Sequence, residues 1–121
     1  MRAAAVLAAL ALLGAVAGCG GDGYPDKPQQ VAKAYMGTNA GSKCRFLTQR
    51  LVETLTAKQG GEARRACERN VARVAAPRQV TLRDAEVEAH DAEVQLLRDG
   101  AEAELKMVRE GDRWKIAGFG E

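Results

Sequence analysis

The residues that could take the largest number of chemical roles in this sequence are its three cysteines, Cys19, Cys44 and Cys67. A cysteine sulfur can ligate a metal, attack a substrate, carry a modification or form a disulfide. A metal site is not expected, because the chain has a single histidine and no Cys-x-x-Cys pair. We therefore expect neither a metal nor another cofactor, and the surroundings of each cysteine decide among the other roles.

Cys19 lies at the end of an apolar N-terminal segment. Arg2 supplies a positive charge, and residues 3–17 are uncharged and apolar. This length is typical of the apolar region of an export signal and is too short to span a membrane. Two cleavage sites compete: Ala15-Val16-Ala17 fits ordinary secretion, and the alternative is cleavage just before Cys19.

The residues Val16-Ala17-Gly18-Cys19 resemble the lipobox of bacterial lipoproteins, in which a peptidase cuts before the cysteine and its sulfur carries a diacylglyceryl group. The resemblance implies a signal peptide at 1–18, a lipidated cysteine with a glycine-rich flexible tether at 19–28, and a folded domain at 29–121. It places the domain on the extracytoplasmic face of the cell membrane, because two acyl chains make a stable anchor where one is marginal.

Cys44 and Cys67 are then an even pair in an oxidising compartment, where a disulfide is the expected state. Aromatic residues make up only 4% of the chain, so the core is expected to be thin. A cross-link closing a loop of this size stabilises a domain by about 3 kcal/mol. The alternative for either residue is a catalytic thiol.

Acid–base catalysis needs titratable groups that face each other. His90 falls in an expected turn, and Asp84, Glu86 and Glu88 alternate along the polar face of an expected strand. These residues are therefore expected at the surface and not in a catalytic pair.

Three other residues fall on apolar faces. Tyr35 and Trp114 are the candidates for lining a pocket, and the alternative for both is a place in the core. Asn70 is expected to be a buried structural amide, which would need hydrogen-bond partners.

The first half of the domain has the period of helices. One helix is expected over residues 29–40, a second begins after the candidate N-cap Ser42, and a third covers about 62–75. The second helix is expected to carry one continuous apolar stripe, formed by Cys44, Leu47, Leu51 and Leu55.

From Val80 onward, apolar residues alternate instead, which predicts strands. Val80 and Leu82 are out of phase with the inward-facing set of Ala85, Val87 and Ala89, so a bulge or bend is expected near residues 83–84. Asp99-Gly100 predicts a tight hairpin, and Trp114, Ile116 and Phe119 lie on the last strand. The prediction is an α+β fold: three N-terminal helices packed on a curved antiparallel sheet of about four strands.

This strand half resembles the nuclear transport factor two-like superfamily, also called the ketosteroid isomerase-like or cystatin-like cone. Its turn, hairpin and closing motifs correspond here to His90–Val94, Asp99-Gly100 and Gly111–Ile116. Small actinobacterial-type lipoproteins of this superfamily carry cysteines in their second and third helices, as Cys44 and Cys67 do. The resemblance implies a cone-shaped domain with a pocket between helices and sheet, but this fold hosts many functions.

Charge is divided unevenly between the two halves. Residues 24–78 hold eleven lysines and arginines against four acids, whereas residues 79–121 hold six against eleven. A tethered domain could rest a basic helix face, formed by Arg64, Arg65, Arg69 and Arg73, on anionic lipid; the alternative is that these arginines are only solvated. Nucleic acid is not expected as a partner, given export and the lack of interleaved aromatic residues.

Two classes of function follow. We expect a non-catalytic envelope lipoprotein that binds a partner protein or a small apolar ligand. The alternative is a small isomerase- or dehydratase-like enzyme with a pocket inside the cone, which would need at least two titratable groups within hydrogen-bond reach of each other.

Overall fold

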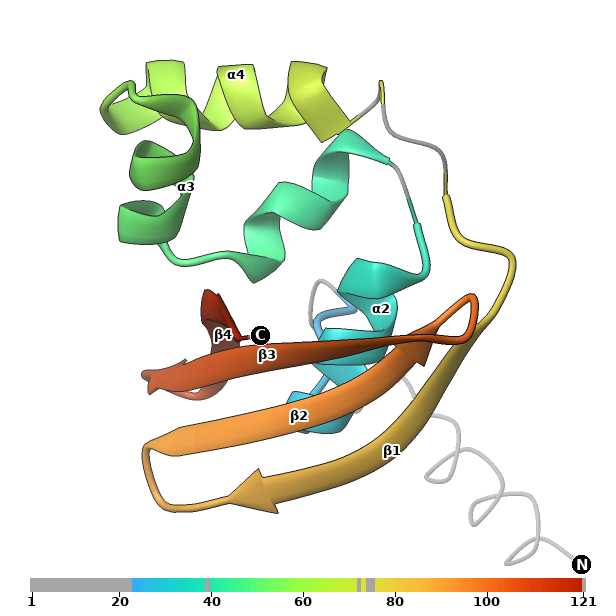
Figure 1. Cartoon of the computed structure of the whole chain (residues 1–121). Helices are drawn as coiled ribbons and strands as arrows, with labels where there is room; N and C mark the ends of the chain where they lie inside the picture. The colour runs from blue at the N-terminus through green and yellow to red at the C-terminus, as the bar shows by residue number, and fades with distance from the viewer. Residues whose placement is uncertain (1–22, 39, 72, 74–75, 121) are drawn as a thin grey trace, which may run out of the picture.

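The computed structural model describes residues 23–38, 40–71, 73 and 76–120 (Figure 1). The expected signal peptide and Cys19 lie outside these residues, as do residues 72, 74 and 75 of the third expected helix. Within the described chain, helices precede a four-stranded antiparallel sheet, which confirms the α+β prediction. The elements are α2 (Pro28–Met36), the 3-10 helix η1 (Gly41–Phe46), α3 (Gln49–Thr56), α4 (Gly60–Val71), β1 (Val80–Val87), β2 (Asp91–Arg98), β3 (Ala101–Glu110) and β4 (Arg113–Gly120).

The sheet has the order β1-β2-β3-β4 and is curved, with helices on one side (Figure 1). Helix α2 contacts β1, β2 and β4, while η1, α3 and α4 pack on one another and reach the sheet through β4. The opposite face carries the exposed side chains of Glu86, Glu93 and Lys106, which are neighbours across three strands. One face of the sheet is therefore covered and the other meets water, as is common for antiparallel sheets.

The hydrophobic core lies between the helices and the covered face of the sheet. Among the described residues, every member of its buried cluster falls between Val31 and Ile116. Trp114 belongs to this core and is only 5% exposed. The strands contribute alternate residues: Ala92, Val94, Leu96, Leu105, Met107, Trp114 and Ile116.

The expected second helix is wrong in one respect, because the structure divides it into η1 and α3. Leu47 and Thr48 are extended between them, and Leu47 pairs in parallel with Ile116 of β4. The Thr48 hydroxyl accepts a hydrogen bond from Leu51 N (3.1 Å), which starts α3 at the next residue. The two segments point in different directions, so the expected stripe does not continue and Leu55 is 53% exposed.

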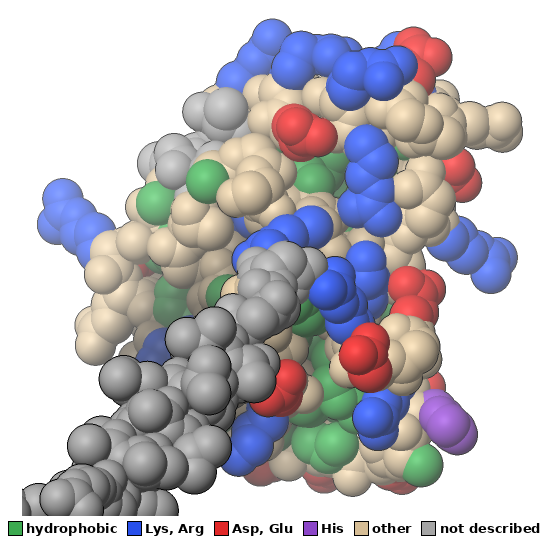
Figure 2. Space-filling view, turned by 180° about the vertical axis from the view of Figure 1, so that it is seen from behind, with side chains coloured by type: hydrophobic (Ala, Val, Ile, Leu, Met, Phe, Trp, Pro, Cys, Tyr) green, Lys and Arg blue, Asp and Glu red, His purple; other side chains and the backbone are tan. Residues whose placement is uncertain are grey.

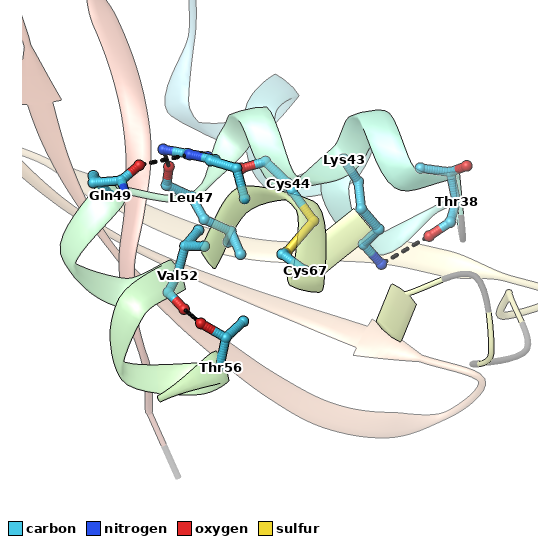
Figure 3. Close-up of a disulfide and its surroundings, with 9 residues drawn as sticks. Thr38, Lys43, Cys44, Leu47, Gln49, Val52, Thr56 and Cys67 are labelled. Atoms are coloured by element: carbon cyan, nitrogen blue, oxygen red, sulfur yellow. Dashed lines mark hydrogen bonds between the residues drawn. A yellow bond between two sulfur atoms is a disulfide. The ribbon is translucent and has the colours of Figure 1, made fainter. Parts of the chain in front are cut away.

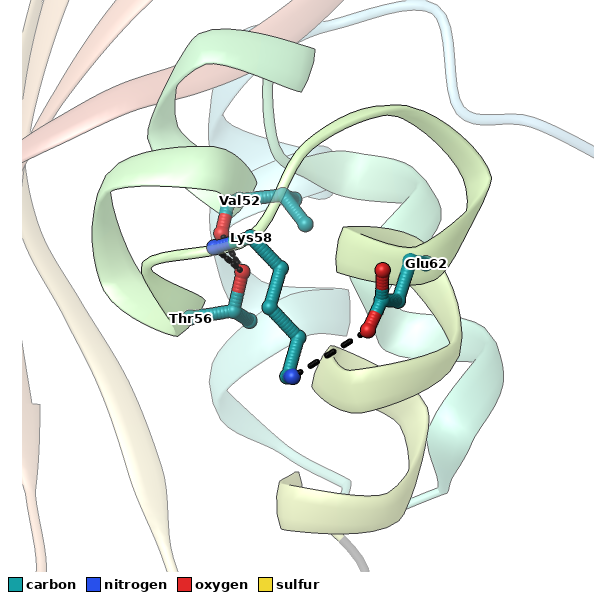
Figure 4. Close-up of polar contacts among 4 residues, drawn as sticks. All are labelled: Val52, Thr56, Lys58 and Glu62. Carbon is teal, nitrogen blue, oxygen red and sulfur yellow. Dashed lines mark hydrogen bonds and ion pairs between the residues drawn. The ribbon is translucent and has the colours of Figure 1, made fainter.

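The loop between α3 and α4 is closed by short polar contacts (Figure 4). The Thr56 hydroxyl donates to the Val52 carbonyl (2.8 Å) and accepts from Lys58 N (3.3 Å). The Lys58 amino group then lies 3.2 Å from a carboxylate oxygen of Glu62, in the first turn of α4. These contacts hold α3 and α4 side by side.

Helix α4 buries a narrow stripe made of Ala63, Ala66 and Cys67. The expectation of a buried Asn70 is wrong, because this residue is exposed. Helix α4 packs on η1 and α3 through Ala63, Ala66 and Cys67, and Asn70 is not part of this buried stripe. Asn70 therefore meets water and needs no buried partners.

Two predictions for the strands are confirmed. The pairing of β1 with β2 shifts register between Leu82 and Asp84, which is the expected bulge. Asp99 and Gly100 both have positive φ (50° and 85°), as a tight hairpin turn requires. The inward position expected for Val87 is wrong: this side chain is 48% exposed, because the end of β1 extends beyond α2 (Figure 1).

Candidate functional site

A groove of about 370 Å³ opens at one end of the sheet, where α2, η1 and α4 come near β2, β3 and β4. Its volume falls within the range of about 300–1,000 Å³ that small-molecule sites occupy. It is lined by Tyr35, Met36, Lys43, Val71, Arg98, Glu102, Ala103, Glu104, Leu105, Phe119 and Gly120. Tyr35, expected to line a pocket, is therefore part of this lining, whereas Trp114 is buried in the core away from it.

One wall of the groove is aromatic. The ring centres of Tyr35 and Phe119 lie 6.1 Å apart, with 32° between the ring planes. Phe119 pairs with Leu105 across β3 and β4, and Leu105 is buried beneath it. The Phe119 ring remains 46% exposed, so the groove presents apolar surface to water.

A second bulge places Phe119 on this wall. Strict alternation from Ile116 would put residues 118 and 120 on the covered face, but the pairing of β3 with β4 shifts register between Lys106 and Met107. The shift brings Phe119, instead of Gly118, opposite Leu105. The three-residue spacing between Ile116 and Phe119 was the sequence signal for this bulge.

The opposite end of the groove is basic. The Lys43 amino group donates to the Thr38 carbonyl (2.8 Å) (Figure 3) and lies 4.2 Å from the centre of the Tyr35 ring. Burial, and secondly the positive charge of Arg98, lower the pKa of Lys43. Burial also raises the pKa of Tyr35, and the Arg98 charge opposes that increase.

The carboxylates of the lining have their own contacts. A carboxylate oxygen of Glu102 lies 2.6 Å from Nη1 of Arg83. The Glu104 side chain lies so close to Gly120 that a Cβ atom there would come within 2.9 Å of its carboxylate. Among the contacts of the described residues, neither acid forms a hydrogen bond with Tyr35, so these two carboxylates do not make an acid–tyrosine pair of the kind that an isomerase would use.

The predicted disulfide between Cys44 and Cys67 is present and joins η1 to α4 (Figure 3). The Cα atoms of the two residues are 6.2 Å apart, within the range for this bond. Because the sulfurs are bonded to each other, neither cysteine is a free thiol. The bond lies next to Lys43, so it fixes the segment that carries the basic end of the groove.

The four arginines of α4 and its end do not form one surface. Arg64 is half-buried and donates to Gln49 Oε1 (2.8 Å), the Cys44 carbonyl and the Leu47 carbonyl (3.2 Å). Arg65, Arg69 and Arg73 are exposed, and basic side chains gather at this end of the molecule (Figure 2). Arg64 therefore holds η1 and α3 in place, while the other three remain candidates for a surface contact.

The remaining candidates for acid–base chemistry are at the surface. His90 is exposed in the turn between β1 and β2, and Asp84, Glu86 and Glu88 are exposed along and after β1. Among the described residues, no three His, Cys, Asp or Glu side chains come together in a way that would hold a metal ion. In this same part of the chain, no helix is both long and apolar enough to cross a bilayer.

Comparisons with known proteins give no relative from which a role can be read. No protein-family model, curated protein or solved structure matches the chain. The groove and its chemistry therefore carry the functional argument.

Proposed function

We propose that this chain is a lipoprotein of the cell envelope, anchored on the extracytoplasmic face of the membrane through Cys19, whose α+β domain binds a small, partly apolar ligand without catalysis. The groove between Tyr35 and Phe119 carries the ligand-binding part of this proposal. It combines an apolar wall, a basic end and a volume suited to a small molecule.

The disulfide supports a place outside the cytoplasm. Disulfides persist in oxidising compartments and are rare where thiols are kept reduced. The sulfurs of Cys44 in η1 and Cys67 in α4 lie at bonding distance, and both residues are buried. This agrees with the export signal expected from residues 1–18.

The attachment of the tether supports a domain held close to its anchor. Tyr24 donates a hydrogen bond to the Trp114 carbonyl, and its ring packs 5.3 Å from that of Phe46. Arg45 and Arg113 both lie over the Tyr24 ring, at 5.6 and 4.7 Å. Cys19 and Tyr24 are five positions apart, so a fully extended chain between them spans at most about 17 Å.

The arrangement of helices and sheet is compatible with the nuclear transport factor two-like resemblance, which remains part of the proposal. In enzymes of that superfamily a base and an oxyanion partner share the pocket. Here the lining offers Tyr35 without a carboxylate hydrogen-bonded to it, which favours binding over the isomerase or dehydratase alternative.

Mass spectrometry of the protein produced in a bacterium with lipoprotein-processing enzymes tests the anchor. We expect the mature chain to begin at Cys19 with acyl groups attached, and the variant Cys19→Ala to leave the membrane fraction. An unmodified N-terminus at Gly18 would instead show cleavage after Ala17, and would contradict the anchor without affecting the groove.

A further inference from the structure

The groove is basic in one part and apolar in another, and a purely apolar ligand would contact only the apolar part. Lys43 and Arg98 lie at one end, and Phe119 and Leu105 form the apolar part. Tyr35 connects the two, since its ring contacts both Phe119 (6.1 Å between ring centres) and the Lys43 amino group (4.2 Å). A ligand that follows the groove therefore meets a cationic end and a hydrocarbon surface in sequence.

The basic end is suited to an anion. Lys43 is half-buried, and the positive charge of Arg98 acts on it, so two like charges are held near each other in partly desolvated surroundings. A negatively charged group beside Lys43 would offset the hydration that this ammonium group has lost. The Lys43 amino group donates to the Thr38 carbonyl, its one hydrogen bond within the described residues, and an ammonium group has three donors, so it can also donate to a ligand.

The acids of the lining do not remove this preference. Glu102 forms an ion pair with Arg83, and the carboxylate of Glu104 lies next to Gly120 on the neighbouring strand β4. Among the contacts of the described residues, neither forms a hydrogen bond with Lys43, which donates to the Thr38 carbonyl. The cationic character at Lys43 is therefore available to a ligand head group.

The apolar part is suited to a hydrocarbon tail. Phe119 is 46% exposed although it stands on the covered side of the sheet, opposite the buried Leu105. Val71 and Met36 are half-buried on the helical side of the same groove. A tail lying between them would remove apolar surface from water, at about 25 cal/mol per Å².

From this arrangement we infer that the groove binds a single-tailed amphiphile with an anionic head group, the head at Lys43 and the tail against Phe119. The inference rests on the proposed ligand-binding function and specifies the chemical class of the ligand. A carboxylate and a phosphate head share the chemistry that Lys43 recognises.

Calorimetric titration of the chain that starts at Gly20 tests the inference, because the buried core residues of the described part of the chain lie between Val31 and Ile116. The probes are dodecanoate, dodecyl phosphate, dodecyltrimethylammonium and butanoate, below their micellar concentrations. We expect the two anionic dodecyl probes to bind at least tenfold more tightly than the cationic one, and butanoate to bind weakly or not at all. The ratio of dodecanoate to dodecyl phosphate affinity distinguishes the two head groups.

Variants of groove residues test whether the probe binds in the groove. Lys43→Gln should weaken dodecanoate binding at least tenfold, and Lys43→Arg should restore most of it. Lys33→Gln, which removes the same charge from an exposed position on α2, is the matched control and should change nothing. Phe119→Ala should weaken dodecanoate binding at least fivefold, with each fold verified by a thermal melt.

Two results would overturn the inference in different ways. Equal affinity for the anionic and cationic dodecyl probes, with Lys43→Gln unchanged, would exclude recognition of the head group and leave the proposed binding of apolar ligands standing. Dodecanoate binding that neither Lys43→Gln nor Phe119→Ala weakens, or no binding of any probe, would show that the groove does not take this class of ligand. Neither result would bear on the membrane anchor, which mass spectrometry of the mature N-terminus tests separately.

Discussion

Arg64 donates a hydrogen bond to the carbonyl oxygen of Cys44 from one turn of α4, and the next turn of the same helix is bonded to the sulfur of Cys44 through Cys67. Helix α4 thus holds η1 at two consecutive points, one polar and one covalent. Lys43, the residue before Cys44, is thereby fixed at the basic end of the groove.

Removing the Arg64 side chain should destabilise the domain by about 2–3 kcal/mol, because it leaves the carbonyl oxygens of Cys44 and Leu47 without their charged donor. Arg65→Ala, on the exposed side of α4, should change stability by less than about 0.5 kcal/mol. Urea unfolding of both variants provides the comparison. Equal effects would mean that the Arg64 contacts contribute nothing beyond surface charge.

Loss of the disulfide should cost about 3 kcal/mol, since residues 44 and 67 are separated by 23 positions and the bond restricts the unfolded chain. The double variant Cys44→Ala/Cys67→Ala and the reduced wild-type domain should unfold at similar urea concentrations, both well below the oxidised form. If the oxidised and reduced forms unfolded together, the bond would have no role in stability.

Glu53 should make the domain sensitive to acid. Gly60 N donates to its carboxylate (2.9 Å), and this hydrogen bond, followed by one from Gln49, lowers the pKa of Glu53 below its usual value of 4.5. The stability from the ionised form is fully present above pH 4.5 and is lost as the pH falls through the lower, folded-state pKa.

The measurement is the melting temperature between pH 6 and pH 2.5. The difference between wild type and Glu53→Gln should shrink as the pH falls below 4.5. Glu88→Gln, at an exposed position after β1, removes the same charge and is the matched control. A difference between wild type and Glu53→Gln that does not change with pH would contradict the assignment.

A side chain at the second turn residue of the hairpin between β2 and β3 should destabilise the domain. Gly100 has φ of +85°, so Gly100→Ala should lose about 1–2 kcal/mol. Gly118→Ala is the control, because a Cβ at Gly118 meets open space and its φ lies outside the left-handed region. We expect that control to be neutral in thermal melts, and a similar loss in both variants would point to strand propensity instead of turn geometry.

Features with a local signal could be predicted from the sequence. The Asp99-Gly100 hairpin and the bulge before Asp84 depend on neighbouring residues, and the disulfide followed from cysteine count and compartment. The division between η1 and α3 was missed because Leu47 keeps helical spacing with Leu51. The competing signal was Thr48, whose hydroxyl begins a new helix.

The basic end of the groove could not be predicted, because Lys43 and Arg98 lie 55 positions apart and neither stands in a motif. They line the same groove only in the folded domain, a relationship set by the packing of η1 and the strands together. Tyr35 was found because its place on the apolar face of one helix is a local property.

The pairing of Leu47 with Ile116 also sets an order of events as the chain folds. Leu47 and Thr48 contact a strand made almost seventy residues later, so the segment between η1 and α3 has to wait for the C-terminus before it can be buried. Cys44 and Cys67 are both available much earlier. The disulfide between Cys44 and Cys67 can therefore form before β4 pairs with Leu47, and it can hold η1 and α4 together until that pairing is made.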